Sequence, residues 1–139
     1  MTRRDELLAL ADRVEAATGA DRELDADIAV AAAGFRRVSE SMLCKDEWDY
    51  ASNADGYFLA WPRYTASIDA ALTLVPSGWT WSIVHEREWE LSGKPAYFSD
   101  LRRGYRTSYD NATLSWSATP ALALTAAALR ALAQETPDD

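Results

Sequence analysis

The chain has few of the residues from which disulfides, metal sites and catalytic sites are usually built. Its 139 residues include one cysteine, Cys44, and one histidine, His85. A lone cysteine cannot close an internal disulfide, and a chain of this length buries enough surface to fold without one. Cys44 and His85 lie in unrelated segments without a flanking motif, which indicates a core cysteine and a strand histidine. We therefore expect one domain over residues 1–139, with no cofactor and no enzymatic activity.

Long apolar runs are also missing. The N-terminal residues from Met1 to Glu6 are mostly polar and lack the apolar segment of a secretory signal. No later run approaches about 18 uninterrupted apolar residues, the length that a membrane-spanning helix needs. These absences predict a soluble, cytoplasmic protein that does not enter a membrane.

Positive charge is in short supply. The chain carries 14 Lys and Arg against 22 Asp and Glu, for a net charge of −8 at pH 7. Non-specific nucleic-acid binding depends on a surplus of Lys and Arg that neutralises phosphates, so we do not expect direct nucleic-acid binding. The acidic balance favours solubility and is compatible with binding a basic surface on another protein.

A glycine-bearing metal loop is missing as well. Four acids stand close together near the start of a predicted helix: Asp21, Glu23, Asp25 and Asp27. Calcium loops arrange their oxygens around one point with the help of a glycine turn, which this segment lacks. The pattern is typical of a capped, solvated helix start, and we expect no metal site.

The N-terminal part of the chain contains two helical patterns. Apolar residues recur at the spacing of one helical face over residues 5–18, with Asp5 as the expected N-cap. A second pattern begins at Asp21 and ends at Gly34, a residue type that readily adopts the left-handed conformation at helix ends. Residues 35–55 carry a diluted pattern, and we expect them to form an insertion.

Two further helices are predicted. Thr65 or Ser67 is the expected cap of a central helix that Pro76 ends. The apolar residues at the spacing of its buried face are Ile68, Leu72 and Val75. A last, alanine-rich helix starts after the N-cap Thr119 and runs through residues 120–134, followed by a frayed tail over 135–139.

Between these helices the apolar period changes from 3.6 to 2. Residues 79–90 alternate as in an antiparallel strand that is covered on one face and wet on the other. Further strands are expected at 57–61, 96–101 and 113–118. Every aromatic residue lies between Phe35 and Trp116. Together the patterns predict an α+β domain, in which an antiparallel sheet of three to five strands is packed by N-terminal, central and C-terminal helices.

Two groups of charged residues are candidate binding surfaces. Glu86, Glu88 and Glu90 fall on one side of the predicted strand, where like charges repel, so this side is either a wet sheet face or an acidic docking surface. The second group mixes basic and aromatic residues, which bind phosphates and stack on bases, although such a mixture also occurs on solvated strands. Its members are Lys94, Tyr97, Arg102, Arg103, Tyr105, Arg106 and Tyr109, with Arg63 as a possible neighbour.

Three pieces of the chain carry a family resemblance. They are residues 21–29, residues 64–76 with the following Gly78 and Trp79, and residues 118–131. In order and spacing, the chain resembles the small phage and prophage proteins grouped as the phage ABA sandwich domain. The resemblance implies a phage or prophage origin and a layered helix–sheet–helix (α/β/α) sandwich. The family has no assigned reaction, so the resemblance implies no catalytic residue.

These observations lead to three hypotheses of function. The first is a non-enzymatic phage accessory protein that binds a host protein in the bacterial cytoplasm, as a modulator or inhibitor of host defence. The second is a protein that binds a nucleotide or similar anion at the basic and aromatic group. The third is a structural protein that self-associates through an exposed strand edge or the alanine-rich helix.

Overall fold

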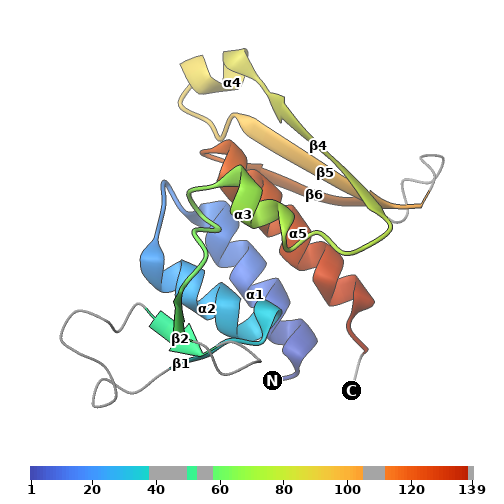
Figure 1. Cartoon of the computed structure of the whole chain (residues 1–139). Helices are drawn as coiled ribbons and strands as arrows, with labels where there is room; N and C mark the ends of the chain where they lie inside the picture. Colours follow the sequence, from blue (N-terminus) through green and yellow to red (C-terminus); the bar gives the residue numbers. More distant parts are fainter. Residues whose placement is uncertain (38–49, 53–57, 105–111, 138–139) are drawn as a thin grey trace.

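The computed structural model describes residues 1–37, 50–52, 58–104 and 112–137 (Figure 1). Its helices are α1 (Arg3–Ala16), α2 (Arg22–Ala33), α3 (Ile68–Leu72), α4 (Arg87–Leu91) and α5 (Pro120–Glu135). Its strands are β1 (Arg36–Arg37), β2 (Tyr50–Ser52), β3 (Phe58–Ala60), β4 (Trp79–His85), β5 (Tyr97–Arg103) and β6 (Ala112–Ser117). The interpretations of Cys44 and of residues 105–111 lie outside the described residues.

The strands form two antiparallel sheets, ordered β1-β2-β3 and β4-β5-β6. In the second sheet Trp79 pairs with Arg103, and Tyr97 pairs with both His85 and Ser117. The α5 helix packs against this sheet, and α1 and α3 pack against α5 (Figure 1). The predicted α+β class, an antiparallel sheet packed by N-terminal, central and C-terminal helices, is confirmed.

The helices α1, α2, α3 and α5 lie on one side of the β4-β5-β6 sheet (Figure 1). Among the described residues, the other side carries side chains of the short α4 and no further helix. The sandwich that the resemblance implies, with helices on both faces, is therefore not found in this part of the chain. The sheet has one covered face and one open face.

Local capping explains where the two N-terminal helices begin. Thr2 is the N-cap of α1, and Asp5 completes a reciprocal capping box with it, because each side chain accepts a hydrogen bond from the other's backbone N–H. The expectation that Asp5 itself is the N-cap was wrong by one turn. The caps expected for α2 are confirmed, since the Asp21 side chain accepts from the Leu24 N–H and Gly34 is left-handed, with φ of 75°.

The central helix is shorter than its pattern predicted. Ser67 caps α3, as one of the two alternatives had it, and Thr65 lies outside the helix. Thr65 is instead buried and donates both its backbone N–H and its hydroxyl to the Asp25 carboxylate, each at 2.8 Å. The expected core position of Ile68 was wrong, because Ile68 is exposed while Ala71 and Leu74 are buried.

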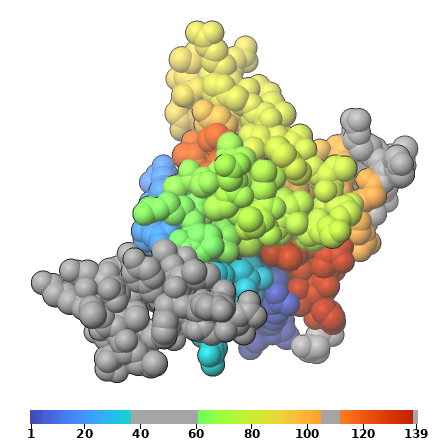
Figure 2. Space-filling view, viewed as in Figure 1, coloured from blue at the N-terminus to red at the C-terminus, as the bar shows by residue number. Residues whose placement is uncertain are grey.

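The strand that starts at Trp79 ends at His85 and does not reach Glu90. The Glu86 N–H donates to the carbonyl of Ala96, which closes the β4-β5 connection, and α4 forms within that connection. The alternating pattern did not predict this strand end, because Glu86, Glu88 and Glu90 still alternate with other residues beyond His85. The hairpin that carries α4 projects from the body of the molecule (yellow in Figure 2).

Small side chains line the contact between α5 and the sheet. Thr113, Ser115 and Ser117 of β6 are buried, and the Thr113 hydroxyl donates to the carbonyl of Ala127 at 2.9 Å. Most of α5 is buried as alanine and leucine. Small residues on both sides let the helix backbone approach the sheet closely. Consequently the larger apolar residues of β6 point to the opposite face.

Candidate functional site: the open face of the sheet

The open face consists of the side chains that alternate away from α5 on the three strands. It contains the half-buried Phe98 and Trp116 and the more exposed Val84 and Leu114, which are 43% and 48% exposed. The complete set is Thr80, Ser82, Val84, Phe98, Asp100, Arg102, Ala112, Leu114 and Trp116. Apolar residues normally face the helices in such a sheet, so their presence on the uncovered side is informative.

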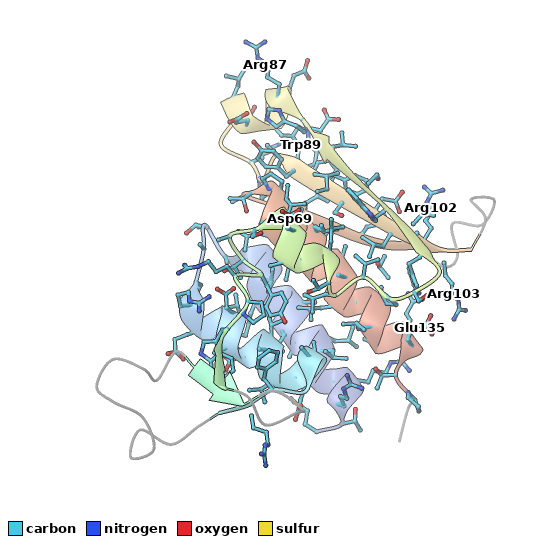
Figure 3. All side chains as sticks on the ribbon, in the orientation of Figure 1. Asp69, Arg87, Trp89, Arg102, Arg103 and Glu135 are labelled. Carbon is cyan, nitrogen blue, oxygen red and sulfur yellow. The ribbon has the colours of Figure 1, made fainter. Side chains whose placement is uncertain are left out.

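Three aromatic rings form the centre of its apolar half. Trp89 of α4 stacks on Trp116 with ring centroids 4.2 Å apart, and Phe98 packs against Trp116 at 4.7 Å. Lys94 follows α4 in the β4-β5 connection, and its ammonium group lies 5.6 Å from the centroid of the Trp89 ring. Figure 3 shows Trp89, a residue of α4, at the end of the sheet where α4 lies. The rings thus make a packed aromatic cluster with apolar neighbours at the surface.

The other half of the open face is polar. Arg102 and Asp100 form an ion pair with two short contacts, Nη2 to Oδ2 at 2.8 Å and Nε to Oδ2 at 3.0 Å. Both side chains are less than one-fifth exposed. They line a hollow of about 450 Å³ together with Thr80, Trp81 and Ser82. Arginine and aromatic residues are both enriched at protein interfaces, and this face carries Arg102 beside the aromatic cluster.

The described members of the predicted basic and aromatic group do not share one surface. Arg102 belongs to the open face, whereas Tyr97 and Arg103 project to the helix side of the same strand. Arg103 meets Glu135 of α5 at 3.4 Å (Figure 3), and Tyr97 stacks on His85 with centroids 4.8 Å apart. Arg63 lies in the segment before α3. Tyr105, Arg106 and Tyr109 are outside the described residues.

The prediction that Glu86, Glu88 and Glu90 lie on one side of a strand was wrong. Glu86 is the N-cap residue of α4, and Glu88 and Glu90 lie within that helix, so the three do not project from one side of a strand. Glu90 instead binds the Nε2 atom of His85. The physical reason is the strand end at His85, after which the chain follows a helical period.

Two other hollows lie on the helical side. One, of about 440 Å³, is lined by the segment around α3 and the first turn of α5, and it includes Asp69 and Thr119. The other, of about 380 Å³, lies between the end of α1 and the β4-β5 connection and includes Glu90, Lys94 and Tyr97. Within the described ranges, no group of three or more His, Cys, Asp or Glu is arranged to hold a metal ion.

The sequence contained a signal for the open face that could not be oriented. In the strand expected at 113–118 the apolar Leu114 and Trp116 alternate with Thr113 and Ser115, and in β6 the two pairs lie on opposite faces of the sheet. Alternation does not tell which of the two sides a helix covers.

Of the helices that the structure describes, none is long and apolar enough to cross a membrane.

Comparisons with protein-family models, with curated proteins and with solved structures found no match to this chain. The resemblance to the phage ABA sandwich domain therefore remains a prediction from the sequence.

Proposed function

We propose that this protein is a non-enzymatic binding module that holds another protein against the open face. The observation that carries the proposal is the aromatic cluster of Trp89, Phe98 and Trp116, flanked by exposed Val84 and Leu114 on an uncovered sheet. Isolated exposed apolar residues are ordinary, but a contiguous group on one face favours an interaction site. Tryptophan and arginine are also the residues that most often dominate binding energy.

The resemblance to phage proteins supports a host protein of the bacterial cytoplasm as the partner, with the module acting as a modulator or inhibitor of host defence. The net charge of −8 supports a partner that presents a basic surface.

Two surface variants with matched exposure test the proposal. Leu114→Lys places a charge in the open face, and Val30→Lys places the same charge on α2, where Val30 is 40% exposed. Both are compared with the unmodified protein as baits for proteins of a bacterial host lysate, with quantification by mass spectrometry. We expect Val30→Lys to retain the captured partner and Leu114→Lys to lose at least about tenfold of it, since a buried unpaired charge costs more than about 1.4 kcal/mol. Equal capture by the two variants would contradict the proposal.

A further inference from the structure

The two outer edges of the β4-β5-β6 sheet differ in how they are closed. At the β6 edge, Glu15 of α1 accepts a hydrogen bond from the Trp116 N–H at 3.3 Å. On the same edge, Arg130 of α5 donates to the Leu114 carbonyl at 2.9 Å. These side chains occupy backbone groups with which another strand would have to pair. The β6 edge is therefore protected against strand addition.

The β4 edge has no such protection within the described residues. Glu86 donates to Ala96, and Gly104 donates to Gly78, so the even-numbered residues of this strand form the ladder to β5. The backbone groups of Trp81 and Ile83 consequently point away from β5. No described strand lies along this edge.

The composition of β4 also lacks the usual means by which edge strands avoid pairing. Residues from Trp79 to His85 include no Lys, Arg, Asp, Glu or Pro, and their register with β5 is continuous over seven residues. Trp81 is 47% exposed at the edge. Such an edge is a template for main-chain hydrogen bonds with an added strand.

Carboxylates mark both ends of β4 on its helix-facing side. Glu135 accepts a hydrogen bond from the Trp79 indole at 2.9 Å, and Glu90 binds His85. A second copy in the antiparallel register that overlaps all of β4 would place Trp79 opposite His85. That register would bring Glu135 of one copy towards Glu90 of the other, and like charges at paired positions are unfavourable. The net charge of −8 opposes the same association.

We propose that the β4 edge accepts an extended segment of the partner protein as an added strand. The segment has apolar residues opposite Trp81 and Ile83 and a Lys or Arg opposite each end of β4. Its basic residues are six positions apart, about 20 Å in an extended chain. This inference rests on the proposed function and names the form of the partner. Because Glu135 also meets Arg103, the basic residue opposite His85 contributes more than the one opposite Trp79.

Two synthetic peptides test the proposal without knowledge of the partner. One has the sequence Lys-Ser-Val-Ser-Val-Ser-Lys with blocked ends, and the other carries Glu in place of each Lys. Binding to the ¹⁵N-labelled full chain is followed by NMR. We expect the Lys peptide to shift the amides of Trp81 and Ile83 and to bind about tenfold more tightly than the Glu peptide. Added salt should reduce that difference, because exposed charges are screened.

Three variants separate this inference from the proposed function. Trp81→Lys should abolish peptide binding, and Glu90→Lys should reduce the preference for the Lys peptide. Leu114→Lys alters the open face and should leave peptide binding unchanged. If Leu114→Lys loses the lysate partner while Trp81→Lys keeps it, strand addition is overturned and the open-face proposal survives. Equal affinity for the two peptides, or concentration-dependent shifts of Trp81 and Ile83 in the protein alone, would likewise overturn strand addition, the latter by assigning the edge to a second copy.

Discussion

At the scale of single residues, Asp25 connects α2 with the segment before α3. Its carboxylate is fully buried and receives hydrogen bonds from the Thr65 backbone, the Thr65 hydroxyl and Arg22. Arg22 also donates to the Trp61 carbonyl, so one ion pair holds the segment before α3 on the start of α2. Burial, with the Asp25 carboxylate as a second cause, raises the pKa of nearby Tyr64 to about 12.

Removal of the Asp25 carboxylate should destabilise the fold strongly. Asp25→Ala leaves the Arg22 guanidinium and the Thr65 donors without their buried acceptor, which typically costs about 3–5 kcal/mol. The free energy of unfolding is measured by urea denaturation. Asp69→Ala, at an exposed position of α3 (Figure 3), is the control and should change stability by less than about 1 kcal/mol. A similar loss in both variants would show that the buried network is not the cause.

Glu15 makes the stability of the protein depend on acid pH. Burial raises the pKa of Glu15, but hydrogen bonds from Arg130 and Ser115 outweigh burial and hold the pKa below its usual value of 4.5. A carboxylate with a lowered pKa in the folded state contributes stability above its unfolded pKa and loses it as the pH falls through the folded pKa. Stability should therefore decline below about pH 4.5 partly through Glu15.

The Glu15→Gln variant tests this dependence. We expect it to be less stable than the unmodified protein at pH 7, with a difference that shrinks as the pH is lowered from 5 to 3. The urea midpoint measured across this range reports the effect. Glu6→Gln, an exposed change in the same helix, controls for a general charge effect. A difference between Glu15→Gln and the unmodified protein that stays constant with pH would refute the linkage.

At the scale of elements, α4 is attached to the sheet by the stacking of Trp89 on Trp116 and by the contact of Glu90 with His85. Its side chains are all exposed to some degree, and Trp89 attaches it to the sheet by stacking on Trp116. Aromatic pairs contribute about 0.5–1.5 kcal/mol beyond the area they bury. A five-residue helix is too short to be stable by itself in water, so its conformation relies on such tertiary contacts, of which the Trp89 stacking is the aromatic one.

Trp89→Ala should therefore loosen the β4-β5 connection while the helical core stays intact. Hydrogen exchange is expected to accelerate at the amides of residues 88–94 and at Trp116, with little change in α1 and α5. Leu91→Ala is the matched control, because Leu91 is 78% exposed on the same helix. Uniform acceleration throughout the chain would mean that Trp89 stabilises the whole fold instead of this connection.

At the scale of the whole molecule, the described residues cover one face and one edge of the β4-β5-β6 sheet and leave its other face and edge open. The alanine-rich α5 and the small residues of β6 close the first face, and Glu15 with Arg130 closes the β6 edge. The open face and the β4 edge share residues of the same strand. Thr80, Ser82 and Val84 of the open face alternate with Trp81 and Ile83 of the β4 edge, so the two proposed binding surfaces adjoin along this strand.

Local sequence alone determined the elements whose signals lie within a few residues. The caps Asp21, Gly34 and Thr119 and the alternation after Trp79 predicted α2, α5 and β4, because capping and periodicity depend only on near neighbours in the chain. The same reasoning predicted the α+β class. The predictions were wrong before α3 and beyond His85. At both places a backbone N–H donates to a residue distant in the chain: that of Thr65 to Asp25, and that of Glu86 to Ala96.

Only the tertiary structure decided which face of the sheet is open. Alternation in β6 separates Leu114 and Trp116 from Ser115 and Ser117, but both assignments of the two faces satisfy the same period. The close approach of α5, a helix of small residues, selects the serine side for burial. That choice depends on packing between segments distant in the chain, and it placed the aromatic cluster, and with it the candidate binding site, on the uncovered face.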